Sequence, residues 1–122
     1  MTFKKDTKEK FTVYTPEFSH FTANMAVHLA QLISENTSAT TAPHVIINAS
    51  PIIEADAAAI AHLLQMQQDA YAQNHSFVLC EVSKSLQPLF QDSLNMVPTE
   101  SEAWDIVQME EIERELLGDI DD

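Results

Sequence analysis

Apolar and polar residues alternate along the chain with two different periods. Residues 11–15 switch between apolar and polar side chains, which predicts a strand that Pro16 closes. Residues 44–48 form an almost wholly apolar, β-branched run, which is typical of a strand covered on both faces within a parallel sheet. Two further apolar runs, 76–82 and 96–97, predict another strand and a minimal one.

Between these strands the apolar residues recur at helical spacing, and polar residues mark the helix ends. Thr22 and Asp56 are suited to accept hydrogen bonds from the free N–H groups of a first helical turn. Thr99 and Glu102 form a capping box, and Gly118 is expected to stop the last helix. The predicted helices cover residues 22–36, 56–74, 85–93 and 99–117.

Strands and helices therefore follow one another in turn. This order predicts an α/β fold with right-handed crossovers, a mixed and mainly parallel central sheet and about four helices. With 122 residues the chain has the length of one domain. We expect a basic N-terminal segment at 1–10, in which Phe3 begins a short edge strand, then a folded domain at 11–117 and a disordered acidic tail at 118–122.

Charge is distributed unevenly around a formal net charge of −13. Residues 99–122 hold ten acids and one base, whereas four of the six bases lie within the first ten positions. Lys84 is the only Lys or Arg between residues 11 and 98, so we expect binding neither to nucleic acid nor to anionic membrane. No apolar run is long enough to cross a membrane and no secretory signal begins the chain, so a cytoplasmic location is expected.

Residue types that carry catalysis or cofactor binding are sparse. The single glycine, Gly118, excludes the P-loop and the dinucleotide fingerprint. The five histidines share no metal-ligand spacing and no G-x-S-x-G elbow is present, although a Ser-His-Asp set assembled across loops stays open. Cys80 lies in an apolar run and is expected to be a buried, unreactive thiol in a reducing compartment. We therefore expect no metal, no cofactor and no enzymatic activity.

The segment His44–Ile60 resembles the centre of STAS domains, the fold of bacterial anti-sigma factor antagonists. That family has a strand of the type I-L-D-L-S, a short turn and then D-S-S-G-L at the start of a helix. Asn48 falls at the acid of the strand, Ser50 at its serine, Asp56 at the acid before the helix and Ile60 at the apolar residue after it. The resemblance implies the STAS fold for about residues 11–117.

Other segments follow the family in the same order. Residues 77–80 match its next strand and residues 94–99 its following turn. The ending 109–116 resembles that of single-domain members from Bacteroidetes-type bacteria.

The resemblance also implies a docking surface and the loss of its switch. In the antagonists, the first serine after the helix-opening acid accepts a phosphate from an anti-sigma factor kinase, and here that position is Ala57. The implied partner-binding residues are Asn48, Ser50, Asp56, Ala57, Ala58, Ala59 and Ile60. The alternative is that the three alanines are only good helix formers and that a partner binds elsewhere or not at all.

The acidic last helix also permits two interpretations. Glu110 and Arg114 are spaced for a surface ion pair, which is typical of a solvated face. Alternatively, Ile112, Leu116 and Leu117 form a second contact stripe, for a partner or for a second copy in a homodimer.

Three functions are compatible with these features. The first is constitutive binding of an anti-sigma factor kinase-like or other signalling protein. The second is the role of STAS accessory subunit in an ABC-type membrane transport system. The third is a small-ligand sensor with a pocket beside the helix that Asp56 opens.

Overall fold

The computed structural model describes residues 3–39, 43–90 and 94–120; for residues 37–39 and 117–120 it describes the backbone only. A five-stranded sheet forms the centre of the chain, in the order β1-β2-β4-β6-β7. β1 pairs antiparallel with β2, and the other neighbours are parallel. The strands are β1 (Phe3–Thr7), β2 (Phe11–Pro16), β4 (His44–Asn48), β6 (Phe77–Cys80) and β7 (Met96–Val97).

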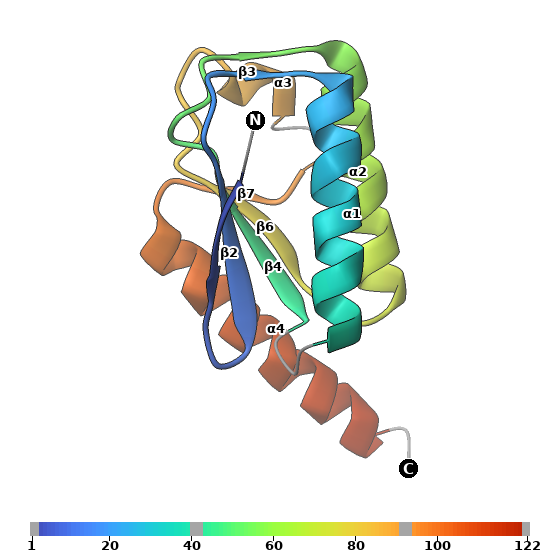
Figure 1. Cartoon of the computed structure of the whole chain (residues 1–122). Helices are drawn as coiled ribbons and strands as arrows, with labels where there is room; N and C mark the ends of the chain where they lie inside the picture. The colour runs from blue at the N-terminus through green and yellow to red at the C-terminus, as the bar shows by residue number, and fades with distance from the viewer. Residues whose placement is uncertain (1–2, 40–42, 91–93, 121–122) are drawn as a thin grey trace.

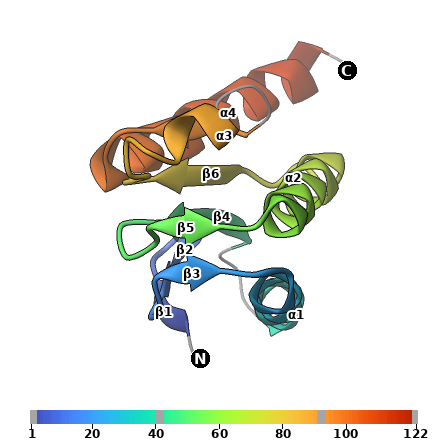
Figure 2. The same ribbon diagram turned by 90° about the horizontal axis from the view of Figure 1, so that it is seen from above.

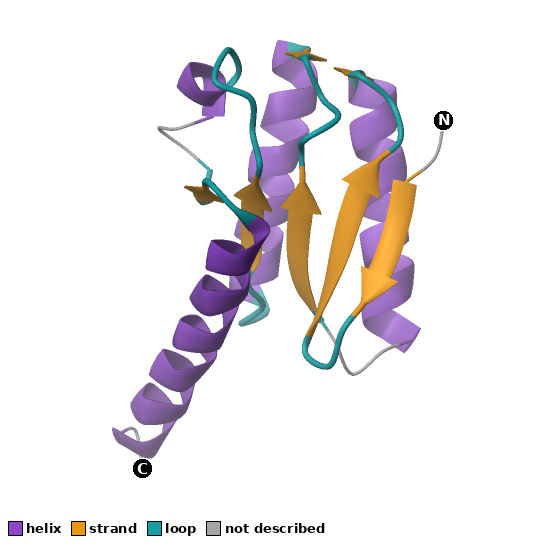
Figure 3. Cartoon of the chain, turned by 90° about the vertical axis from the view of Figure 1, so that its left-hand side faces the viewer, coloured by secondary structure: helices purple, strands orange, loops and turns teal. Residues whose placement is uncertain are grey.

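Helices cover both faces of this sheet. α1 and α2 lie side by side on one face (Figure 1), and α4 packs on the other face, where it is nearest the viewer in Figure 3. The view from above separates the α1–α2 pair from α4 (Figure 2). The helices are α1 (Ala23–Ala39), α2 (Ala57–Ala72), α3 (Gln87–Phe90) and α4 (Glu100–Ile120). The predicted α/β class with a mixed, mainly parallel sheet is confirmed.

The two covered faces explain why the central strands are apolar at nearly every position. Val45 and Ile47 of β4 point into the core under α1 and α2, whereas Ile46 packs in the core under α4. The α4 core also contains Ala103 and Val107, both fully buried. Because both faces of this strand are buried, polar residues do not alternate with apolar ones along it, as the apolar run at residues 44–48 had indicated.

The last helix corrects one prediction. α4 continues through Gly118 to Ile120, so the expected stop at Gly118 is wrong, and the expected disordered tail 118–122 is helical as far as Ile120. Residues 121–122 lie outside the described part of the chain. A glycine ends a helix when it takes the left-handed conformation, but within the described residues no glycine has positive φ. Inside a helix it costs only about 1 kcal/mol relative to alanine.

Two further differences concern short elements. α3 spans only Gln87–Phe90, whereas a helix at 85–93 was predicted, and residues 91–93 lie outside the description. A separate two-stranded sheet joins β3 (His20–Phe21) to β5 (Glu54–Ala55) at the edge where α2 begins. The sequence did not predict it, because two residues are too few to show a period. No helix within residues 3–39, 43–90 and 94–120 combines the length and apolarity needed to cross a bilayer.

Candidate functional site at the start of helix α2

The start of α2 presents two small side chains to solvent. Asp56 is the N-cap residue, in extended backbone conformation, and its carbonyl accepts the hydrogen bond of the Ile60 N–H at 3.1 Å. Ala57 and Ala58 are exposed, but Ala59 is fully buried in the core beneath α2. Ala59 therefore cannot contact a docked protein, and its place in the predicted patch is corrected. The helical turn itself forces this, since successive residues point about 100° apart.

The side chain of Asp56 binds a histidine instead of capping its helix. His20 Nε2 lies 2.8 Å from Asp56 Oδ1, and His20 Nδ1 lies 3.8 Å from Glu54 Oε2. Asp56 makes no side-chain capping hydrogen bond. Pairing of β3 with β5 sets His20 opposite Glu54, and the Asp56 N–H donates to the Phe21 carbonyl at 3.0 Å. Two carboxylates and an imidazole thus border Ala57.

Sequence reasoning did not find His20, because it lies 36 residues from Asp56 and belongs to no motif. Only the β3–β5 pairing brings the two residues together.

Asn48 braces the fold beside this patch. Its amide donates to Glu100 Oε1 at 3.1 Å, and its carbonyl oxygen accepts the Ser50 N–H at 3.0 Å. The end of β4 is thereby tied to the start of α4. Asn48 is half-buried, and Ile60 is half-buried against the core. Ser50 is exposed at the turn.

Two exposed apolar side chains lie at the same edge of the sheet. Ile53, in the loop that leads into α2, is 62 % exposed. Leu89 is exposed on α3, which stands at the edge where α2 starts (Figure 3). Single exposed apolar residues of this kind are common on protein surfaces. Of the predicted partner-binding residues, Ser50, Asp56, Ala57 and Ala58 are exposed, and these four are called the docking patch.

The far half of α4 carries the second predicted stripe. Ile112 and Leu116 are 56 % and 57 % exposed, Met109 is exposed one turn earlier, and the Leu117 side chain lies outside the description. This part of the helix extends beyond the lower end of the strands (Figures 1 and 3). Its other side is held by polar contacts, since Tyr71 donates to Glu110, and Arg114 Nη2 lies 3.8 Å from Glu110 Oε1.

The remaining candidate residues are the metal-ligating side chains and Cys80. Among the residues that the structure describes, no three His, Cys, Asp or Glu side chains gather as they would around a metal. Cys80 is buried in β6, and this burial raises the pKa of its thiol to about 12. The thiol is therefore protonated at neutral pH, as is usual for a buried cysteine.

Comparison with known proteins identifies the architecture. No protein-family profile and no curated protein sequence matches the chain. Solved structures do match. SpoIIAA in its unphosphorylated form superposes with a TM-score of 0.69 and 19 % identity, over 88 % of this chain and 98 % of its own.

The chain has the fold of the anti-sigma factor antagonists. Phosphorylated SpoIIAA from Bacillus gives a TM-score of 0.68 at 20 % identity, over 87 % of this chain and 99 % of its own. A candidate anti-sigma factor antagonist from Thermotoga maritima gives a TM-score of 0.73 at 12 % identity, over 87 % of this chain and 94 % of its own. A chain of the stressosome, a signal integration and transduction hub, gives a TM-score of 0.65 at 10 % identity, over 86 % of this chain and 96 % of its own. The TM-scores of 0.65 to 0.73 establish the antagonist fold despite the low identities, and so confirm the predicted STAS fold.

Proposed function

We propose that the chain is a protein-interaction domain that binds an anti-sigma factor kinase-like regulator through the start of α2, without a phosphate switch. One observation carries the proposal: position 57 is exposed at the first turn of α2 and ends in a methyl group. The structurally similar SpoIIAA exists in an unphosphorylated and a phosphorylated form. Alanine has no hydroxyl that could accept a phosphate, so this position stays in one state.

The physical effect of the missing hydroxyl is large. A phosphate would add a charge of about −1.5 to −2 and three strong acceptors at the surface. Asp56 and Glu54 already place two carboxylates near the start of α2, and a phosphate at position 57 would add more negative charge there. Ala57 and Ala58 instead leave a small, uncharged area that a partner can cover closely.

The proposal predicts that Ala57→Glu weakens partner binding while the domain stays folded. A carboxylate at a helix start is favourable for the dipole, so the free energy of unfolding should change by less than about 0.5 kcal/mol. Binding should weaken at least about tenfold, because a charge would be buried at the centre of the interface. Gln68→Glu is the matched control, since it adds the same charge at an exposed position in the second half of α2.

The measurement has two steps. Affinity purification from the source cell identifies the partner by mass spectrometry, and calorimetry with the purified partner then gives the dissociation constants of the three proteins. Recovery of no kinase-type regulator by a folded bait would contradict the partner class. Equal affinity of Ala57→Glu and wild type would place the interface elsewhere.

A further inference from the structure

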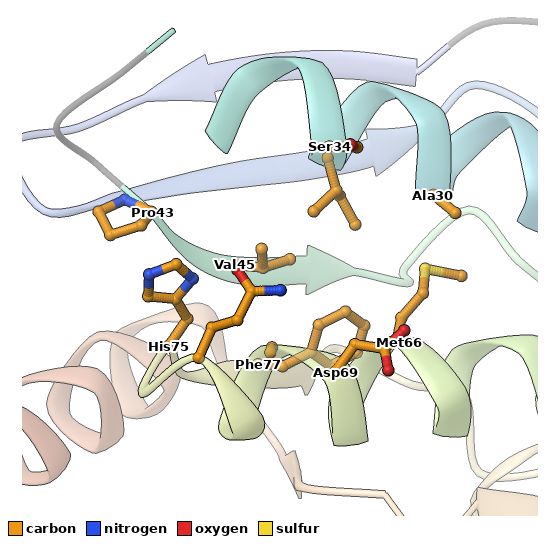
Figure 4. A pocket seen from close by; sticks show the side chains of 11 residues that line it. Ala30, Ser34, Pro43, Val45, Met66, Asp69, His75 and Phe77 are labelled. Carbon is orange, nitrogen blue, oxygen red and sulfur yellow. The ribbon is translucent and has the colours of Figure 1, made fainter. Parts of the chain in front are cut away.

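A cavity of about 290 Å³ opens between α1 and α2, at the opposite end of α2 from Ala57 (Figure 4). Its volume lies just below the range of about 300–1,000 Å³ for small-molecule sites, so only a small ligand fits. α1 contributes Ala30 and Ser34, and α2 contributes Met66 and Asp69. This site is separate from the docking patch, so nothing in the proposed function depends on it.

The deep side of the cavity is apolar. Val45 of β4 and Phe77 of β6 form its floor, and both are buried members of the core. Ile33 and Met66 add apolar surface from the two helices. Ala30 ends at Cβ, so no longer side chain of α1 fills the space in front of it. Such a surface suits a compact hydrocarbon group.

Polar groups gather on the side of the cavity formed by α2 and the start of β6. Figure 4 shows Asp69 on the α2 side and His75 at the end of the cavity toward Pro43. Gln65 Nε2 donates to Asp69 Oδ1 at 2.9 Å, which holds that carboxylate in place and leaves its second oxygen without a bond to Gln65. Gln73 adds an amide to the lining.

The charges around the cavity favour one class of ligand. Burial, followed by the proximity of His44 and Arg114, lowers the pKa of His75, so this imidazole adds no positive charge at neutral pH. Among the described residues that line the cavity none is Lys or Arg, and Asp69 is the one acid. The net charge of −13 further favours cations over anions near the protein.

We propose that this cavity binds a small alkyl or aryl amine, with its apolar body on Val45 and Phe77 and its ammonium group on Asp69. The carboxylate accepts a charge-assisted hydrogen bond, which is stronger than one between neutral groups. Gln73 and His75 lie within the same lining and offer further neutral hydrogen-bonding groups. An amine therefore binds more tightly than an alcohol of the same shape, and a carboxylate of similar shape does not bind.

The test is a titration of the ¹⁵N-labelled chain with cyclohexylmethylamine, followed by two-dimensional NMR. The expected result is saturable shifts confined to residues around Ala30, Ala70 and Phe77, with about tenfold weaker binding of cyclohexylmethanol. Cyclohexanecarboxylate should cause no saturable shift. Shifts spread along acidic α4, or equal binding of the carboxylate, would overturn the proposal. So would the absence of saturation by the amine at millimolar concentration.

Two variants separate the contribution of the Asp69 charge from that of the open cavity volume. Asp69→Asn, at an exposed position, should reduce amine binding about tenfold and leave alcohol binding unchanged. Asp105→Asn is its control, because it removes one charge from an exposed position on α4. Ala30→Leu should fill the cavity and abolish binding of both compounds, and a thermal melt checks that it folds. Equal loss of amine binding in Asp105→Asn would show general charge attraction and contradict the site.

Discussion

The side chains that matter most at the residue scale are those that join distant segments. His44 is buried at the start of β4, and both of its ring nitrogens are bonded. The Ser76 N–H donates to Nδ1 at 2.9 Å, so Nε2 carries the proton that is donated to Glu111 Oε1 at 2.7 Å. Glu111 also pairs with Lys10 at 3.0 Å. One carboxylate thereby connects α4 to the beginnings of β2 and β4.

Glu111 should make the protein sensitive to acid. Burial alone would raise the pKa of its carboxyl, but hydrogen bonds from Lys10 and His44 outweigh burial and lower the pKa below its ordinary value of 4.5. Its stabilising effect is therefore complete above about pH 4.5 and is lost as the pH falls through the lower folded-state pKa. Thermal melts from neutral pH to about pH 3 should show a smaller fall in Tm for Glu111→Gln than for wild type.

The control for this acid effect is Glu113→Gln, an exposed neighbour on α4. It should melt with the same pH dependence as wild type. If acidification lowered the Tm of Glu111→Gln and of wild type equally, other carboxyl groups would be responsible for the acid sensitivity.

At the scale of elements, α2 and α4 each divide into halves with different roles. α2 begins in the proposed docking patch and ends beside the cavity. α4 covers the sheet with its first half, through Ala103 and Val107, and its second half extends past the strands. Helices need only one face for the core, so the remaining surface of each is available for contacts.

The role of the exposed stripe of α4 in partner binding can be tested without changing the stability of the domain. Ile112→Ser and Leu116→Ser should each change the free energy of unfolding by less than about 0.5 kcal/mol, because both side chains are more than half exposed. If the stripe contacts the partner, the double variant should weaken binding measurably in calorimetry. Unchanged binding, together with unchanged mass in solution by light scattering, would assign this face to solvent. Val27→Ser is the control, because it makes the same kind of change at an exposed apolar position on α1.

At the scale of the whole molecule, a single sheet carries two cores on its two faces. Leu63 of α2 lies in one core at 2 % exposure, and Trp104 of α4 borders the other. The strands between them belong to both cores. A domain of this size is expected to unfold in one cooperative transition.

Leu63→Ala should therefore destabilise both layers together. The expected loss is about 2–5 kcal/mol, the usual cost of removing a buried leucine side chain. Fluorescence of Trp104, the only tryptophan, reports the α4 layer, and circular dichroism reports the whole chain. Both should give the same lowered urea midpoint. Leu89→Ala, at an exposed position on α3, should leave it nearly unchanged, and separate transitions would contradict one cooperative unit.

Patterns within a few residues determined most of the elements. The strands predicted at 11–15 and 44–48 are both present, although residues 11–14 are all buried and do not alternate in exposure. The caps at Thr22 and Thr99 are present too: the Met25 N–H lies 3.4 Å from Thr22 Oγ1, and the Glu102 N–H donates to Thr99 Oγ1 at 3.2 Å. The sequence resemblance correctly indicated the fold and placed Ala57 at a helix start. These features depend on side-chain period and on local hydrogen bonds, which a linear sequence displays directly.

Tertiary structure alone decided what lies next to these positions. His20 reaches Asp56 across 36 residues, and His44 reaches Glu111 across 67. The burial of Ala59 and the cavity between α1 and α2 likewise depend on how the helices pack on the sheet. Such contacts follow from the path of the chain through crossovers. Residues far apart in sequence leave no shared local pattern from which their meeting could be predicted.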